Sequence, residues 1–227
     1  MSTRAGTPMI RRHSSLTVGT HATVGLLVIV VAVTGLGLLG VLPTPLLRAF
    51  GGHAGVRAWH YWTGIALTCV FVVIPIAAPQ QAWQFVRDVS RYRVSDLAWL
   101  LNFMRFSVAQ ARRPVPAHAG RFDPVQRAIF ALMTIALAVL AVTGVALPLI
   151  PPSARALVGA CVRIHDATGW AFIGLLGLHI VAGSGVLPTH RGVALAMATG
   201  RVSLRVAQRL WPGWTARQPD EHAPRSD

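Results

Sequence analysis

Charged residues are scarce in this chain of 227 residues: they make up 12% of it, and only 7 of them are Asp or Glu. Lysine is absent, so all 21 basic residues are arginine. Hydrophobic residues account for 53%. Soluble domains usually contain about 25% charged residues. The composition therefore excludes an ordinary soluble domain and is typical of a membrane protein.

Four long stretches contain no charged residue, namely 22–42, 59–78, 128–150 and 167–187. Crossing a bilayer as a helix takes ~20 apolar residues, so each stretch is long enough to span a membrane. The pattern predicts an all-α membrane protein, a four-transmembrane-helix bundle with additional interfacial helices.

The arginines are divided unevenly between the segments outside these stretches. Seventeen belong to the N-terminal segment, the second loop and the C-terminal segment, and four belong to the first and third loops. The positive-inside rule then places both termini and the second loop in the cytoplasm. The net charge of +14 mainly orients the protein, and we expect some of the arginines to meet anionic lipid head groups. The distribution of the charge argues against a nucleic-acid partner.

The two cysteines, Cys69 and Cys161, form neither a Cys-x-x-Cys-His attachment motif nor a metal-ligand pair. We interpret both as small packing residues. Arg11 and Arg12 precede the first apolar stretch, as in an export signal. That stretch is long and lacks an obvious cleavage pattern, so we expect an uncleaved first helix.

The chain divides into four segments by composition. We expect a cytoplasmic tail at 1–15, a transmembrane domain at 16–190 that includes a cytoplasmic loop at 79–127, a cytoplasmic interfacial helix at 191–214 and a disordered tail at 215–227. The first tail is also polar enough to be disordered. Within the loop, 81–91 and 96–111 have the apolar spacing of short amphipathic helices. Pro114 and Pro116 would end the second one.

The two halves of the chain resemble each other. Val33-Thr34-Gly35 recurs as Val142-Thr143-Gly144, and His60-x-x-Thr63-Gly64 recurs as His165-x-x-Thr168-Gly169. An internal duplication would produce two helix pairs in the same orientation. Chance remains the alternative, because Thr-Gly is common in apolar helices.

Four histidines lie in or beside the apolar stretches: His21, His60, His165 and His179. The last two share one stretch and lie 14 residues apart, a spacing that returns to nearly the same helix face about 21 Å further along. The predicted topology places His60 with His165 near the outer side and His21 with His179 near the cytoplasmic side. Two levels with two imidazoles each can hold two haems. Ionisable groups inside a membrane are costly, which favours ligation over ordinary hydrogen bonding.

Haems held in this way would be non-covalent and b-type, because neither cysteine belongs to an attachment motif. Small residues on the ligand-bearing helices leave room for a macrocycle: Gly25, Gly35, Gly64, Gly169, Gly174 and Gly177. Arginines offer partners for haem propionates: Arg57, Arg155 and Arg163 for the outer haem, and Arg11 or Arg12 for the inner one. We expect Asp166 to cap the fourth span rather than to tune a ligand. The other histidines are interpreted as solvated: His13, His53, His118, His190 and His222.

On these residues the chain resembles the di-haem cytochrome b (gamma) subunit of membrane-bound formate dehydrogenases, within the bacterial cytochrome b group that also serves nickel–iron hydrogenases. The resemblance covers about residues 10–214. Its carriers are the four histidines, Arg-Ile-His-Asp at 163–166, Leu-His-Ile at 178–180, Arg-Phe-Asp-Pro-Val-Gln-Arg at 121–127 and Met-Ala-Thr-Gly-Arg-Val-Ser at 197–203, followed by Trp211.

The resemblance implies a subunit of the bacterial inner membrane that receives electrons from periplasmic iron–sulfur and catalytic subunits. The electrons would pass through the two haems and reduce quinone near the cytoplasmic face. No residue of this chain would be catalytic in the oxidation of the donor. Where the family has an Asn and a Gly beside the quinone, this chain has Asp123 and Val125, and Gln126 is kept. Asp123 and Gln126 are thus the quinone candidates, the former as a carboxylate open to the cytoplasm.

Three other functions remain open. A stand-alone di-haem cytochrome b, such as a superoxide oxidase, would use the same ligands without a partner, whereas the long second loop and the tail favour a subunit of a complex. The cytochrome b subunit of a hydrogenase would differ only in its donor. A small transporter or an assembly factor would lack the absorption bands of reduced b-type haem.

Overall fold

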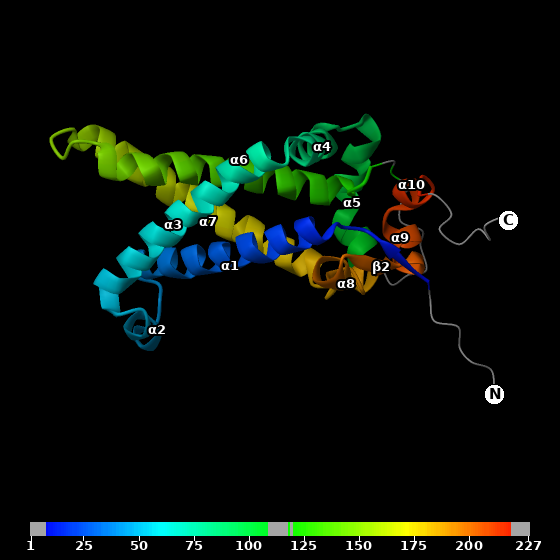
Figure 1. Ribbon diagram of the computed structural model, residues 1–227, viewed down its shortest axis with the longest axis horizontal. Helices are drawn as coiled ribbons and strands as arrows, with labels where there is room; N and C mark the ends of the chain where they lie inside the picture. The colour runs from blue at the N-terminus through cyan, green and yellow to red at the C-terminus, as the bar shows by residue number, and fades with distance from the viewer. Residues whose placement is uncertain (1–7, 109–117, 119, 219–227) are drawn as a thin grey trace. The chain divides into compact units, whose positions relative to one another are not determined.

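The computed structural model describes residues 8–108, 118 and 120–218 (Figure 1). The elements in chain order are β1 (Met9–Arg11), α1 (Ser15–Leu38), α2 (Thr44–Ala49), α3 (Gly52–Ala77), α4 (Pro79–Ser90), α5 (Val94–Val108), α6 (Pro124–Ala146), η1 (Leu147–Leu149), α7 (Arg155–Gly183), η2 (Pro188–His190), α8 (Ala194–Thr199), β2 (Arg201–Ser203), α9 (Leu204–Leu210) and α10 (Pro212–Thr215).

The chain forms two compact units. The first, here called the membrane unit, comprises Gly19–Val86 and Phe130–Leu178. The second, here called the polar unit, comprises Met1–Val18, Arg87–Ile129 and His179–Asp227. The second loop was expected to belong to the transmembrane domain, followed by an interfacial helix at 191–214 and a disordered tail at 215–227. In the structure, most of that loop belongs to the same compact unit as the N-terminal and C-terminal segments.

Four helices are long and apolar enough to cross a membrane: Ser15–Leu38, Gly52–Ala77, Pro124–Leu149 (α6 continued by η1) and Arg155–Gly183. The prediction of four spans is confirmed. Several helices begin before their apolar stretch, because nothing in the preceding residues breaks a helix. Ser14 caps α1 by accepting a hydrogen bond from the Thr17 amide at 3.1 Å. Since α7 begins at Arg155, Asp166 lies inside the helix, and the prediction that it caps the span was wrong.

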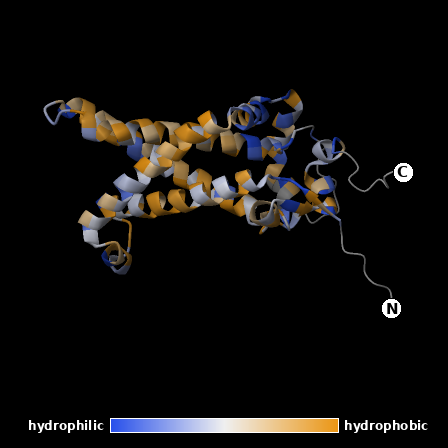
Figure 2. Ribbon diagram, viewed as in Figure 1, coloured by the Kyte–Doolittle hydropathy of each residue, from blue (hydrophilic) through white to orange (hydrophobic). Residues whose placement is uncertain are grey.

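The membrane unit has a small core to which each spanning helix contributes one buried residue: Val28, Leu67, Ala136 and Phe172. Most of its other large apolar side chains face outward, as for Ile76 at 74% exposure and Val142 at 69%. Figure 2 shows hydrophobic residues along the whole length of these helices. Outward-facing apolar surface of this extent is what a bilayer covers.

The membrane unit consists of two helical hairpins. In one, α1 and α3 are joined through α2, and in the other, α6 and α7 are joined through η1. Both connections lie at the same end of the unit (Figure 1). The two hairpins therefore have the same direction, as the repeat in the sequence predicts.

The polar unit contains a two-stranded antiparallel sheet in which β1 pairs with β2, Ile10 opposite Val202. Residues 1–15 were expected to be a disordered tail, and residues 9–11 instead form this strand. The interfacial helix expected at 191–214 is also replaced, by α8, β2, α9 and α10. Gly200 ends α8 in the left-handed conformation with φ 74°, and Ser203 caps α9. Hydrophobic residues of these elements form the core of the unit: Val193, Ala196, Val202, Ala207, Leu210 and Trp211.

The amphipathic helices expected in the second loop are present as α4 and α5. Figure 2 shows many hydrophilic residues on α4. Pro114 and Pro116, which were expected to end the second helix, lie outside the described residues.

Candidate haem-binding site

A cavity of about 550 Å³ lies within the membrane unit and is lined by residues of all four spanning helices. This volume falls within the range of ~300–1,000 Å³ that is typical of ligand and cofactor sites. Apolar side chains form most of the wall, among them Val28, Leu67 and Phe172 of the core. Two imidazoles, those of His60 and His165, also line the cavity.

His60 is held through Nδ1 by groups of α1. This nitrogen lies 3.1 Å from the carbonyl oxygen of Val31 and 3.2 Å from Oγ1 of Thr34. A carbonyl oxygen only accepts, so Nδ1 carries the proton and donates. The unprotonated nitrogen is then Nε2, which is the atom available to a metal.

His165 is held in a corresponding way by α6. Its Nδ1 lies 2.8 Å from Oγ1 of Thr143. The hydroxyl of Thr143 donates to the carbonyl of Val139 at 2.7 Å, which leaves its oxygen to accept from the imidazole. Nδ1 of His165 therefore also carries the proton, and Nε2 remains as a possible ligand atom.

The two imidazole rings lie close together in the wall of the cavity. Their centroids lie 6.1 Å apart, and the ring planes are inclined by 82°. Two bonds of ~2 Å between imidazole nitrogen and metal, plus two ring radii of ~1.2 Å, give a separation of about 6.4 Å. The observed separation is close to that needed for a single metal ion held by both rings.

Glycines provide the space that the imidazoles and a macrocycle require. A Cβ atom at Gly35 would lie 3.2 Å from Cε1 of His60, and one at Gly144 would lie 3.4 Å from Cε1 of His165. Gly64 and Gly169 line the cavity one turn beyond the histidines, and a Cβ atom there would meet nothing within 4 Å. The donor set, the apolar wall and this open space together fit a haem with two histidine ligands.

Of the arginines proposed for the outer propionates, Arg57 lines the cavity, as does Asp166. Arg155 and Arg163 are exposed on α7 and are not among the lining residues. Cys161 is buried, and its thiol lies 3.6 Å from the carbonyl of Thr143, in agreement with the packing interpretation.

The second predicted pair is divided between the two units. His21 lies on α1 in the membrane unit, and His179 lies on α7 in the polar unit. Because α7 is one continuous helix, His179 follows His165 by about 21 Å along its axis. The pairing of His21 with His179 stays a prediction.

Asp123 and Gln126, the quinone candidates, form a reciprocal cap at the start of α6. Oδ1 of Asp123 accepts from the Gln126 amide at 2.8 Å, and Oε1 of Gln126 accepts from the Asp123 amide at 3.4 Å. The expectation that Asp123 is open to the cytoplasm was wrong, since the residue is 2% exposed. Burial raises the pKa of its carboxyl to about 6, against the lowering effect of amide hydrogen bonds from Gln126 and Val125 and of the charges of Arg127 and Arg12.

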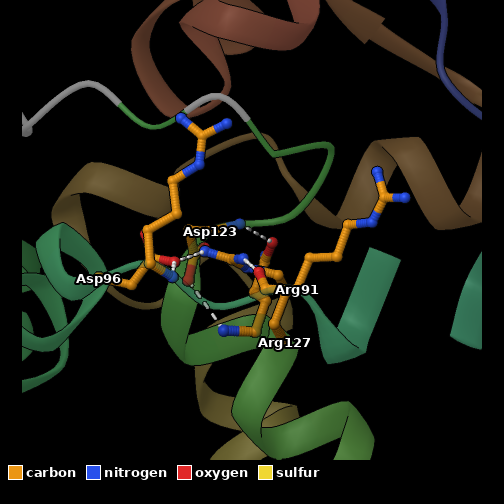
Figure 3. A network of polar contacts seen from close by, with 6 residues as sticks. Arg91, Asp96, Asp123 and Arg127 are labelled. Carbon is orange, nitrogen blue, oxygen red and sulfur yellow. Dashed lines mark hydrogen bonds and ion pairs between the residues drawn. The ribbon is translucent and has the colours of Figure 1, made fainter. Parts of the chain in front are cut away.

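The residues around this cap form a network of polar contacts (Figure 3). Arg127 makes an ion pair with Asp96 at 2.8 Å, and both side chains are buried. Arg127 also donates to the carbonyl of Arg91 and lies over the ring of Tyr92. The network ties the start of α6 to the junction between α4 and α5.

Arg11 and Arg12, proposed for the inner propionates, lie in the polar unit. Arg11 belongs to β1 and is paired with Arg201. The guanidinium of Arg12 is buried, with its carbon 3.8 Å from the ring centroid of Trp211 and 4.2 Å from that of Trp214. This stacking gives Arg12 a structural function in the core of the polar unit.

Two histidines interpreted as solvated are buried. His118 is 7% exposed, and its Nε2 donates to the carbonyl of Leu210 at 2.8 Å. His190 is 1% exposed and packs edge-on against Phe103. Burial lowers the pKa of both imidazoles, that of His190 to about 4. His222 lies outside the described residues.

Sequence reasoning found the two facing histidines but missed the threonines that hold them. The available signal was the repeated Val-Thr-Gly, whose Thr and Gly both contact the histidine of the other helix in the same hairpin. The repeat therefore corresponds to the same local geometry in both hairpins.

The family model described as prokaryotic cytochrome b561 matches residues 12–200, which is most of the chain and includes all four predicted haem ligands. No curated protein matches the chain.

Proposed function

The chain belongs to the prokaryotic cytochrome b561 family, and we propose that it is the electron-transfer subunit of a periplasmic oxidoreductase resembling formate dehydrogenase, with two b-type haems and quinone as acceptor. Family membership establishes the general class, a multi-pass membrane protein that transfers electrons with b-type haem. The observation that carries the proposal is the pair of His60 and His165. Both line the cavity, and their ring centroids lie 6.1 Å apart.

His60 and His165 would hold the outer haem. A b-type haem held by these two imidazoles would supply reversible one-electron exchange. The chain orients the imidazoles through Thr34 and Thr143, and its apolar wall excludes water. Because both imidazoles would be used to hold the haem, the site suits electron transfer. Arg57, which lines the cavity, would pair with a propionate.

His21 and His179 would hold the inner haem. The continuity of α7 supports this proposal, because one straight helix then presents His165 and His179 at two levels about 21 Å apart. The internal repeat does not supply the second pair. The residue of α6 that corresponds to His21 by the 109-residue offset is Phe130.

Asp123 and Gln126 would line the quinone site. The pKa of about 6 allows Asp123 to bind or release a proton near neutral pH, which suits proton uptake during quinone reduction. Gln126 uses its Oε1 to accept from Asp123 and, at 3.3 Å, from Nε1 of Trp211. Its amide NH₂ group is thus the part that would donate to a quinone oxygen.

The orientation proposed for the chain has both termini and the second loop in the bacterial cytoplasm, with the protein in the inner membrane. The division of arginines into seventeen and four supports it. Reporter fusions after residue 220 should report the cytoplasm, and fusions near Gly52 should report the periplasm. The reverse result would invert the electron path.

The experiment that tests the function is purification of the chain with its native partners, followed by haem quantification and reduction by candidate donors. We expect two b-type haems per chain, reduced by formate through the copurified subunits and reoxidised by a quinone analogue. Absence of b-type bands would exclude an electron-transfer function.

The same preparation separates the alternatives. If hydrogen instead of formate reduces the haems, the chain is the cytochrome of a hydrogenase. If the chain copurifies with no partner and superoxide reduces its haems, it acts alone. The structured polar unit favours a complex, because a stand-alone haem core would not need it.

A further inference from the structure

The two facing histidines differ in what holds their Nδ1 atoms. His60 has two acceptors, the Val31 carbonyl at 3.1 Å and Thr34 Oγ1 at 3.2 Å. Among the contacts described for His165, the only acceptor is Thr143 Oγ1, and its distance of 2.8 Å is the shortest of the three. The second hairpin therefore relies on one side-chain hydroxyl where the first also has a backbone carbonyl.

Each threonine is committed to accepting this hydrogen bond. The Thr143 hydroxyl donates to the Val139 carbonyl at 2.7 Å, and the Thr34 hydroxyl donates to the Val30 carbonyl at 2.7 Å. A hydroxyl has one proton, so its oxygen faces the imidazole as an acceptor. Both tautomers are thereby set with the proton on Nδ1.

We propose that Thr143, and to a smaller degree Thr34, are positioning residues that set the reduction potential of the haem held by His165 and His60, an inference that rests on the proposed function. An acceptor on the Nδ1 proton makes an imidazole a stronger electron donor to iron. The stronger donor stabilises ferric over ferrous iron and so lowers the potential. Loss of the acceptor should raise the potential.

The bond that a threonine makes within its own helix does not account for the contact between the threonine and the histidine. Threonines in apolar helices commonly bond to the carbonyl four residues earlier, and Thr134 on α6 does so with Phe130 at 2.7 Å. Thr134 does not line the cavity and has no described contact with a histidine. It is thus a matched control on the same helix as Thr143.

The experiment is a spectroelectrochemical titration of the two-haem protein carrying Thr143→Val, Thr34→Val, Thr143→Ser or Thr134→Val. The outer haem is identified as the component that disappears in His60→Ala. We expect Thr143→Val to raise the ratio of reduced to oxidised outer haem about tenfold at a fixed applied potential. This corresponds to a rise of ~59 mV in the reduction potential of a one-electron couple. Thr34→Val should change it about threefold, because the Val31 carbonyl remains. Thr143→Ser and Thr134→Val should leave it unchanged.

The outcomes separate this inference from the proposed function. If the unmodified chain binds no haem between His60 and His165, the proposed function fails. If it binds haem but Thr143→Val and Thr134→Val have the same potential, the inference is overturned. If Thr143→Val loses the haem, the Thr143→Ser variant decides. Haem retained in Thr143→Ser at the original potential supports a requirement for the hydroxyl group. Loss of the haem in Thr143→Ser, or a shift of its potential as large as that expected for Thr143→Val, refutes this requirement.

Discussion

The two units of this chain bury different kinds of polar side chain. In the described part of the membrane unit the buried polar residues are Thr34, Thr63 and Thr143. The polar unit buries charged and titratable groups: Arg12, Asp96, His118, Asp123, Arg127 and His190. The hydroxyl group of a threonine can donate a hydrogen bond to a backbone carbonyl of its own helix, so threonine is tolerated in apolar surroundings. A charge needs a partner, and the polar unit supplies one to Asp96 and Arg127.

The difference extends to the histidines. In the membrane unit, the imidazoles of His60 and His165 line a cavity, and their described hydrogen-bond partners are neutral groups. In the polar unit, the imidazole of His118 is buried and donates to the backbone carbonyl of Leu210. The same residue type therefore has different surroundings in the two units.

The largest effect expected is from His165→Ala, which removes one of the two imidazoles proposed to hold the outer haem. Haem content should fall from two to one per chain, because a single imidazole holds the iron far less well. The alkaline pyridine spectrum of the purified protein measures this. His53→Ala, an exposed position on the α3 helix, is the control and should keep both haems. Two haems per chain in His165→Ala would contradict the assignment.

Gly64→Leu tests whether the cavity itself is the haem site. A Cβ atom at this position would meet no atom within 4 Å, and the residue lines the cavity, so the helix should still form while a larger side chain displaces the macrocycle. We expect outer-haem occupancy to fall on the order of tenfold, since a steric overlap of this kind costs ~1–3 kcal/mol. Ala66→Leu on the exposed side of the same helix should have no effect. Equal haem content in the two variants would place the haem elsewhere.

Asp96→Asn tests the polar unit alone. The substitution leaves the charge of Arg127 buried without its counter-ion, which typically costs ~3–5 kcal/mol. We expect faster cleavage by trypsin in the second loop while the outer-haem spectrum is retained. Asp88→Asn, at a partly exposed position without a described ion pair, is the control. Loss of the outer haem in Asp96→Asn would show that the two units do not act independently.

Asp123→Asn tests the titration of the buried carboxyl. Because its pKa in the folded protein is raised to about 6, the folded state binds more protons than the unfolded state between pH ~4 and 6, and stability falls as pH rises through that window. Asn still caps the helix but does not ionise, so the variant should lose this dependence and be more stable above pH 6, by at most ~3 kcal/mol. Thermal unfolding in detergent as a function of pH measures this.

The same variant tests the proposed quinone function. Asp123→Asn should slow quinone reduction while both haems remain reducible by the partner, because Asn carries no titratable proton. Unchanged quinone reductase activity together with a lost pH dependence would leave only the structural function of the cap.

Much of the membrane unit could be predicted from sequence. The four spans follow from the absence of charge over ~20 residues, because a bilayer makes each intramembrane charge costly. The exact starts of the helices did not follow, since α3 and α7 continue through polar residues outside the apolar stretch, and Asp166 was misplaced for that reason. His60 and His165 were predicted from depth to lie together, and their ring centroids are 6.1 Å apart, whereas haem ligation by them stays a prediction.

The polar unit was predicted less well. Its helices α4 and α5 have a local periodicity that the sequence displays, but its sheet and its core do not. The pairing of Ile10 with Val202 joins opposite ends of the chain, and the bond from His118 to Leu210 spans 92 residues. No local pattern signals such contacts, and so His118 and His190 were taken for surface residues.

The sequence by itself determined that this chain has four helices long and apolar enough to cross a membrane and carries histidines in or beside them, because both properties depend on the order of residues along single helices. Only the tertiary structure decided which groups hold those histidines. Thr34 meets His60 from 26 residues away and Thr143 meets His165 from 22. These contacts exist because two helices of a hairpin pack side by side, with Gly35 and Gly144 letting the rings approach, and packing of this kind depends on the whole fold.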